Sequence, residues 1–139
     1  MSNKPLHIGD NLSIFAWVNL QDLNTSSSLT GIGGMHTISN GSGSYTNRRG
    51  MGLNIHQNGS ICFSWGDGNG RFQYNNECSN KSIGLNQWYH IGFTCQKKNT
   101  TTSTITLYID GAECGTHDID NLYNPDDYVH LFSWARDGQ

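Results

Sequence analysis

Two runs of alternating apolar residues constrain the fold of this chain more than any other feature. The run Tyr89–Cys95 places an apolar side chain at every second position, and Ile105–Ile109 does the same. Alternation of this kind puts the apolar side chains on one face of a β-strand. The polar segment Lys97–Ser103 lies between the two runs and suits an exposed tip. Together they predict an antiparallel hairpin with one apolar face.

Two further segments give strong strand signals. Met51–Ile55 and Ile61–Trp65 alternate on either side of Asn58-Gly59, a dipeptide typical of two-residue turns in which both residues take positive φ. Leu12–Leu20 is apolar on both of its alternating faces, so we expect a strand covered on both sides or curling into a sandwich. In this interpretation the indoles of Trp17 and Trp65 belong to the core.

The remaining strand signals are weaker. Short strands are predicted over residues 35–40, 71–75 and 128–134, and residues 21–34, 41–50 and 76–87 are predicted as loops. Residues 112–127 are predicted as a loop or an edge segment. No segment has a convincing helical pattern. Short strands separated by turns indicate an all-β, antiparallel sandwich.

Length and charge narrow the class of protein. The chain has 139 residues, which fits one domain over 1–139, and a net charge of -3 with only 14% charged residues. This composition gives no basic surface for nucleic acid, and no apolar stretch is long enough to insert into a membrane. The N-terminus lacks the apolar core of a signal peptide. We therefore expect either a cytosolic start or a leader that has been removed.

The four cysteines show no zinc-binding spacing. Cys62 and Cys95 fall in apolar strand patterns and are predicted to be small core residues. Cys78 and Cys114 fall in loop-like segments and could pair with each other. Because the given sequence shows no leader, we expect free thiols.

The order of the strands resembles a known family. A strand such as Leu12–Leu20 is followed much later by Trp88–Thr94, "WYHIGFT", and then by Ile105–Gly111, "ITLYIDG". This arrangement is similar to the laminin-G-like, concanavalin A-like jelly-roll superfamily. The resemblance implies two curved antiparallel sheets, with Trp88 capping the core and Asp110-Gly111 turning the chain. The resemblance also implies that most residues of this motif have a structural role.

The resemblance is incomplete at the C-terminal end. Such domains usually close with one more strand after the segment that matches residues 128–139, and that strand is missing here. Either the chain is part of a longer one, or another chain fills the gap. An unfilled slot would leave backbone groups unpaired at a sheet edge.

Enzymatic activity is not expected. Glycoside hydrolases of this fold need two carboxylates about 5–10 Å apart, and the only glutamates, Glu77 and Glu113, lie in different predicted loops. Asp118 and Asp120 have a suitable spacing but lie in no clear strand pattern. No nucleophile elbow is present.

Calcium is the one cofactor that the sequence suggests. Relatives in the superfamily often hold calcium at one rim of the sandwich, and calcium binds several oxygen ligands on a flexible loop. The segment from residue 118 to 127 is rich in such ligands. The candidate ligands are Asp118, Asp120, Asn121, Asp126 and Asp127. The alternative is that these residues only form turns, where Asp and Asn are common.

A ligand-binding site is predicted in the loops. Tyr45 lies in a Gly/Ser-rich segment with Asn47, Arg48 and Arg49, and Tyr123 lies in the acidic segment. Loops on a rigid sandwich often carry recognition, and exposed Tyr, Asn and Arg are typical of binding surfaces. A solvated loop with an incidental aromatic residue is the alternative.

These observations favour a non-catalytic recognition module that binds surface glycans or a protein partner. We expect it on a virion surface, as in a phage tail fibre or capsid decoration, or on a cell surface. A purely structural module that docks on a neighbouring subunit by strand addition is the first alternative. A subunit resembling a glycoside hydrolase is the second.

Overall fold

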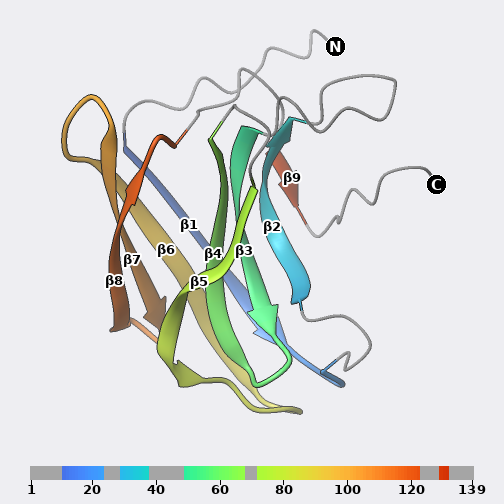
Figure 1. Cartoon of the computed structure of the whole chain (residues 1–139). Coiled ribbons are helices and arrows are strands. Elements are labelled where there is room, and N and C mark those ends of the chain that lie inside the picture. Colours follow the sequence, from blue (N-terminus) through green and yellow to red (C-terminus); the bar gives the residue numbers. More distant parts are fainter. Residues whose placement is uncertain (1–10, 24–28, 38–48, 68–71, 123–128, 132–139) are drawn as a thin grey trace, which may run out of the picture.

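The computed structural model describes residues 11–23, 29–37, 49–67, 72–122 and 129–131 (Figure 1). These residues form strands and connecting turns, and they contain no helix. No membrane-spanning helix therefore occurs in this part of the chain. The strands are β1 (Asn11–Asn19), β2 (Leu29–Thr37), β3 (Arg49–His56), β4 (Ser60–Asp67), β5 (Phe72–Ser82), β6 (Trp88–Lys97), β7 (Thr102–Ile109), β8 (Ala112–Asp120) and β9 (Val129–Leu131).

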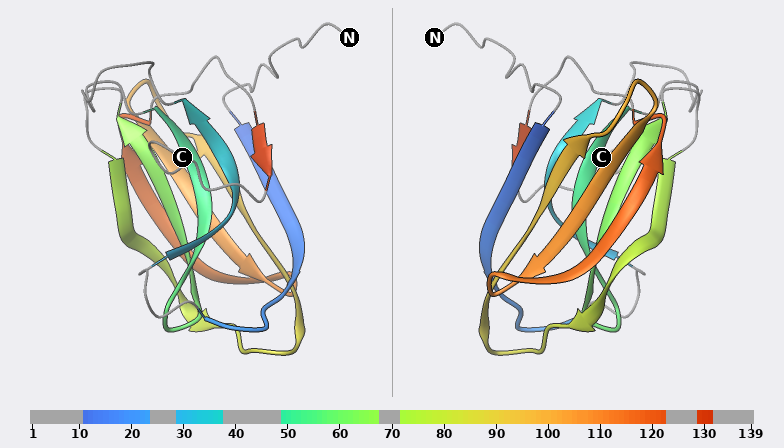
Figure 2. Two further views of the ribbon diagram at one scale, coloured as in Figure 1. Left: turned by 90° about the vertical axis from the view of Figure 1, so that its right-hand side faces the viewer. Right: turned by 90° about the vertical axis from the view of Figure 1, so that its left-hand side faces the viewer.

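The strands make two antiparallel sheets. One sheet has the order β1-β6-β7-β8, and the other has the order β5-β4-β3-β2-β9. Figure 2 shows the two sheets as curved layers packed face to face. Each sheet buries one face against the other, which is why its strands alternate between apolar and polar residues. The predicted all-β sandwich is confirmed.

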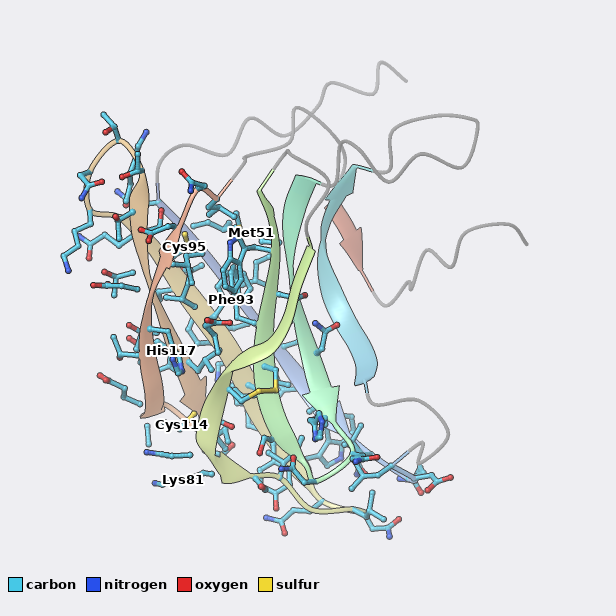
Figure 3. All side chains as sticks on the ribbon, viewed as in Figure 1. Met51, Lys81, Phe93, Cys95, Cys114 and His117 are labelled. Carbon is cyan, nitrogen blue, oxygen red and sulfur yellow. A yellow bond between two sulfur atoms is a disulfide. The ribbon has the colours of Figure 1, made fainter. Side chains whose placement is uncertain are left out.

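The core lies between the two sheets. The ring of Phe63 on β4 meets that of Phe93 on β6 edge to face, with 4.9 Å between centroids. Figure 3 shows Phe93 and Met51 in this space between the layers. The largest side chains that are fully buried come from five strands of both sheets. They are Leu53, Ile55, Ile61, Phe63, Ile91, Phe93, Ile105, Leu107 and Ile119.

The hairpin predicted from the two alternating runs is present as β6 and β7. Ile91 pairs with Ile109 and Phe93 pairs with Leu107, so the apolar side chains of both strands face inward together. Asp110 and Gly111 then connect β7 to β8, with φ values of 50° and 76°. Two successive residues with positive φ form the turn that suits a tight hairpin.

The turn between β3 and β4 differs from the prediction. Gly59 has φ 83°, but Asn58 is not among the described residues with positive φ. The connection is Gln57–Gly59, and the amide of Gly59 donates to the carbonyl of His56 at 2.8 Å. A three-residue loop of this kind needs a left-handed residue only at its last position. The hairpin prediction is confirmed, but the two-residue turn is wrong.

β2 begins at Leu29, β3 begins at Arg49 and β5 continues to Ser82, so each extends into a segment predicted as a loop. β8 covers Ala112–Asp120 at the edge of its sheet, so the edge segment, one of the two predictions for residues 112–127, is confirmed there. These segments contain few apolar residues, so their alternation is weak. Their backbones pair with longer neighbouring strands, and this tertiary pairing overrides the weak local preference. Asp118 and Asp120 therefore lie on a strand.

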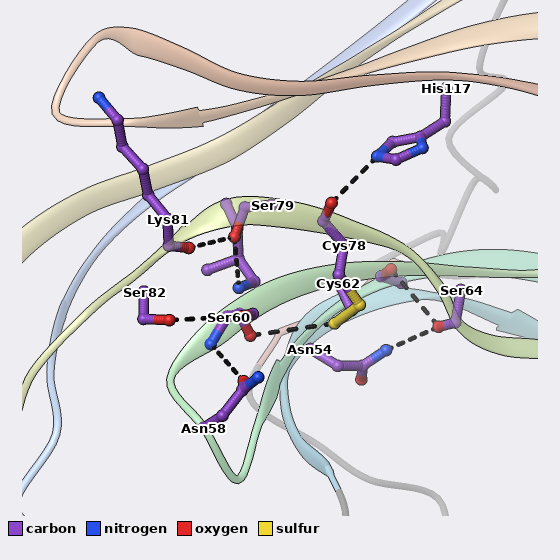
Figure 4. Close-up of a disulfide and its surroundings, with 12 residues drawn as sticks. Asn54, Asn58, Ser60, Cys62, Ser64, Cys78, Ser79, Lys81, Ser82 and His117 are labelled. Atoms are coloured by element: carbon purple, nitrogen blue, oxygen red, sulfur yellow. Dashed lines mark hydrogen bonds between the residues drawn. A yellow bond between two sulfur atoms is a disulfide. The ribbon is translucent and has the colours of Figure 1, made fainter.

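The prediction that all four cysteines are free thiols is wrong. Cys62 forms a disulfide with Cys78 (Figure 4), and the two residues stand opposite each other on β4 and β5 with their Cα atoms 4.0 Å apart. The suggested pairing of Cys78 with Cys114 is also wrong. Because residue 78 was predicted in a loop, its cross-strand partner could not be identified. Cys95 and Cys114 are free and buried. Cys62 is fully buried as well, so burial is confirmed for both Cys62 and Cys95, the two cysteines predicted in the core.

Two of the three indoles assigned to the core are on the surface. Trp65 is buried as predicted, and its indole N–H donates to the carbonyl of Asp120 at 3.3 Å. Trp17 and Trp88 are 63% and 61% exposed. Both point away from the inner faces of β1 and β6, where Val18 and Ile91 are buried. The role of Trp88 as a cap on the core is therefore wrong.

Candidate functional site

A group of exposed and half-buried aromatic side chains lies on the outer face of the β1-β6-β7-β8 sheet. We call it the outer aromatic face. It consists of Phe15, Trp17, Trp88, His90 and Tyr108. Exposed aromatic patches on a soluble domain often mark binding surfaces.

The rings of this face form a connected row. The imidazole of His90 stacks on Phe15 with 5.4 Å between centroids and lies 5.1 Å from the indole of Trp17. Phe15 also approaches Tyr108, at 5.8 Å. The row therefore crosses β1, β6 and β7. Ring contacts at these distances stabilise the side chains in fixed positions.

Strand register brings these residues together. Trp17 stands opposite His90, and Phe15 stands opposite Gly92, which in turn stands opposite Tyr108. Gly92 has no side chain, so the ring of Phe15 can lie across it. A Cβ built on Gly92 would overlap this ring and the carbonyl oxygen of Ile14. The glycine is thus required for the row to cross β6.

Trp88 extends the face at one end. It stands opposite Asn19 and is the diagonal neighbour of Trp17, a relationship that leaves side chains within reach of each other. The side-chain oxygen of Asn19 accepts a hydrogen bond from the Gln21 amide at 3.0 Å. Two planar amides therefore lie next to the two exposed indoles.

The turn after β7 fixes the backbone beneath His90. The carboxylate of Asp110 accepts a hydrogen bond from the backbone N–H of His90 at 2.8 Å, and the Asp110 N–H donates to the His90 carbonyl at 2.7 Å. Both bonds hold the turn to β6. The central ring of the outer aromatic face is consequently attached to a well-ordered part of the sheet.

The other half of the same outer face is polar. Thr102 donates to Asp120 at 2.9 Å, and Thr104 donates to Asp118 at 2.7 Å. The ammonium group of Lys98 also binds Asp118, at 2.7 Å. The hydrogen bond from Lys98, followed by that from Thr104, lowers the pKa of the Asp118 carboxyl below its ordinary value of 3.8.

These contacts bear on the calcium prediction. Both carboxylate oxygens of Asp118 accept hydrogen bonds, one of them from the Lys98 ammonium group, which a calcium ion would have to displace. Asn121 follows β8 with φ 56°. Asp126 and Asp127 lie outside the described residues. Within the described part of the chain, no three His, Cys, Asp or Glu side chains could hold a metal ion together.

The predicted ligand-binding loops lie largely outside the described residues. This applies to Tyr45, Asn47, Arg48 and Tyr123. Arg49 is the first residue of β3, and its backbone pairs with Thr37 and Asp67. Of these five residues, the structure therefore describes only the backbone of Arg49, and the predicted ligand-binding loops remain a prediction.

A half-buried polar pair, Glu77 and His117, lies between the sheets, where β5 faces β8. Glu77 stands opposite Phe63 and shares its inward direction. Burial raises the pKa of the Glu77 carboxyl, while the nearby charge of His117 lowers it by a smaller amount. The His117 ring donates from Nε2 to the carbonyl of Cys78 at 3.1 Å (Figure 4). Neither side chain belongs to the outer aromatic face.

The positions of the aromatic residues along β1 indicate that they face outward, although the sequence-based interpretation places Trp17 in the core. Phe15 and Trp17 occupy the opposite phase of β1 from Ile14, Ala16 and Val18, and an edge strand of a two-layer sandwich has only one covered face. His90 and Tyr108 have the same outward phase on β6 and β7. Only the strand register could show that these four rings meet.

Comparison with known families agrees with this architecture. A family model described as the concanavalin A-like lectin/glucanases superfamily matches residues 1–137. Neither a curated protein nor a solved structure matches the chain. The family match spans nearly the whole sequence, and the two-sheet sandwich is the architecture that the resemblance implied. The chain belongs to the concanavalin A-like lectin/glucanase superfamily.

Proposed function

We propose that this chain is a non-catalytic recognition module that binds surface glycans or a protein partner through its outer aromatic face. The observation that carries the proposal is the exposure of two indoles, Trp17 at 63% and Trp88 at 61%, on a rigid sheet. Exposing large aromatic surfaces to water is unfavourable, and such patches commonly become covered on binding. The superfamily includes lectins, which fits this role.

The positions of the glutamates support a non-catalytic module. Glu77 points between the sheets, whereas Glu113 is exposed and accepts a hydrogen bond from Thr116 at 2.7 Å. A glycosidase needs two carboxylates that flank the same bond of the substrate. These two do not open on a common surface.

The loops are a second part of the proposal. Tyr45, Asn47, Arg48, Arg49 and Tyr123 remain predicted contacts for the same ligand or for another part of it. Calcium remains a prediction that now depends mainly on Asp126 and Asp127. Binding measured with and without calcium tests this part separately.

The proposed setting is an oxidising surface, that of a virion or of a cell. The disulfide between Cys62 and Cys78 supports this setting, since disulfides persist at extracellular, cell and virion surfaces and are rare in the cytosol. A tail fibre or a capsid decoration is one such location. No nucleic-acid partner and no membrane insertion are proposed.

The test combines two readouts for one labelled protein. A glycan array, with and without calcium, measures sugar binding. A panel of intact bacterial and animal cells, untreated or treated with glycosidases or a protease, measures surface binding and its chemical basis. We expect binding to at least one glycan or cell surface. A chain that binds no glycan and no cell surface contradicts the proposed function.

A second candidate is a structural module that docks by strand addition. Within the described residues, β1 pairs only with β6, and strand addition would use its other edge. The inward side chains Leu12, Ile14 and Ala16 are only partly buried, which suits a strand with a neighbour missing on one side. For this candidate we expect Ser13→Pro to weaken assembly with a neighbouring subunit, and we expect no glycan binding by the wild type.

A further inference from the structure

We propose that the outer aromatic face binds a neutral sugar ring, with Trp17 as the main stacking platform and Trp88 as a second. This inference rests on the proposed recognition function and names its ligand class and contact residues. Sugars present a face of C–H groups that packs on an aromatic ring, and their hydroxyls bind planar polar side chains nearby. The described residues supply both kinds of contact.

The size of the exposed patch favours a small ligand over a second copy of this chain. Phe15 is 41% exposed and the two indoles just over 60%. For aromatic side chains of about 150–250 Å², these fractions leave roughly 250–400 Å² of apolar surface. A stable protein–protein interface buries about 800 Å² on each partner. The patch is suited to one or two sugar rings.

The charge around the patch favours a neutral ligand. The outward positions of β1 from Asn11 to Asn19, and of β6 from Trp88 to Gln96, carry no Lys, Arg, Asp or Glu. Asp110 borders the patch, the exposed Glu113 stands opposite Tyr108, and Lys98 is occupied at the far half of the sheet by Asp118. A sulfated or sialylated glycan would find no unpaired cation among these residues to match its charge.

The Trp17 indole is also held in place and has polar side chains beside it. Contact with His90 on one side limits the motion of Trp17, so little side-chain entropy is lost when a ligand covers the indole. The hydrogen bond between Asn19 and Gln21 holds both amides close to the two indoles. Their remaining donors and acceptors could bind sugar hydroxyls.

The experiment compares four proteins on one glycan array. The array carries neutral glucosyl, galactosyl, mannosyl and N-acetylglucosaminyl oligosaccharides beside sialylated and sulfated glycans. The proteins are the wild type, Trp17→Ala, Trp88→Ala and the control Thr104→Ala, whose side chain is on the polar half of the same face. Thermal unfolding verifies that each is folded. Sedimentation gives the oligomeric state, and indole N–H signals are followed by NMR with methyl glycosides of the same sugars.

We expect the wild type and Thr104→Ala to bind a neutral glycan equally. Trp17→Ala should weaken this binding at least tenfold, and Trp88→Ala should weaken it severalfold. The indole signals of Trp17 and Trp88 should shift on titration, whereas that of buried Trp65 should not.

Several results would overturn the inference while leaving the proposed function standing. One is neutral-glycan binding that survives in a Trp17→Ala/Trp88→Ala double variant. Another is binding restricted to sialylated or sulfated glycans, or cell-surface binding without any sugar. A wild-type dimer that becomes monomeric on Trp17→Ala would show that a second copy covers the patch. Absence of both glycan and cell-surface binding would overturn the function itself.

Discussion

The ring of Phe15 lies across Gly92 on the neighbouring strand and reaches Tyr108 on the strand beyond. This arrangement exists because residue 92 has no side chain, and it joins three strands on the outer face. The same glycine stands between the core residues Ile91 and Phe93, which are fully buried on the inner face. A single position therefore affects both the outer aromatic face and the pairing of β1 with β6.

Gly92→Ala should destabilise the fold. The new Cβ would overlap the ring of Phe15 and the carbonyl oxygen of Ile14, and the latter belongs to the backbone of β1, which cannot move without disturbing the strand pair. Overpacking of this kind costs about 1–3 kcal/mol. The measurement is the midpoint of urea unfolding with an unchanged slope.

Gly84→Ala is the matched control for this change. A Cβ on Gly84 would meet the hydroxyl of Tyr89 at 3.5 Å, which is an ordinary contact. We expect no more than a small change in the midpoint. Equal stability of the two variants would contradict the close packing of Phe15 on Gly92.

Substitutions at the contact between Phe63 and Phe93 should be among those that destabilise the fold most. Phe63→Ala removes the ring that meets Phe93 at 4.9 Å and leaves a cavity between two sheets that cannot easily close. The expected loss is about 3–5 kcal/mol in the free energy of unfolding. Trp88→Ala is a suitable control because its indole is exposed, and it should cost much less. A loss below 1 kcal/mol for Phe63→Ala would contradict the described core.

The disulfide between Cys62 and Cys78 determines how many cysteines should react with a thiol reagent. In denaturant without reductant, two of the four cysteines, Cys95 and Cys114, should react with a thiol reagent, and all four should react after reduction. The bridge closes a loop with a sequence separation of 16, and a loop of about 15 residues corresponds to about 3 kcal/mol of stabilisation. Cys62→Ala/Cys78→Ala should lose a similar amount in chemical unfolding. Four reactive thiols in the unreduced protein would rule the bridge out.

The two free thiols should be unreactive in the folded protein. Burial raises the pKa of both Cys95 and Cys114, so few of these groups are thiolates near neutral pH. Alkylation at pH 8 should therefore be slow under native conditions and fast in denaturant. Alkylation at the same rate in both conditions would contradict their burial.

The sequence alone predicts the two-sheet sandwich but not the outer aromatic face. Strong alternation, as in Ile105–Ile109, identified the strands whose inner face is buried, because the hydrophobic effect is what orders them. It identified only the start of β5 and left β8 as a loop or an edge segment, because the backbones of these two strands are ordered by pairing with their neighbours. The outer aromatic face depends on register, since Trp17 and His90 are more than seventy positions apart in the sequence and meet only because β1 pairs with β6.

Glu77→Gln should change how stability depends on pH. Burial raises the pKa of the Glu77 carboxyl above its ordinary value of 4.5 and outweighs the opposing effect of His117. From pH 4.5 up to the raised value, the folded state therefore binds more protons at this site than the unfolded chain does. The contribution of Glu77 to the free energy of unfolding is fully present below this window and falls as the pH rises through it.

Replacing the Glu77 carboxyl with an amide removes its contribution to the pH dependence of the free energy of unfolding. The free energy of unfolding should decline less with rising pH in Glu77→Gln than in the wild type, because a neutral side chain carries no desolvated charge. Urea unfolding at a series of pH values from 4 to 8 measures the slope, and Glu113→Gln on the exposed outer face controls for the loss of one negative charge. Identical slopes in Glu77→Gln and the wild type would mean that the Glu77 carboxyl is not desolvated between the sheets.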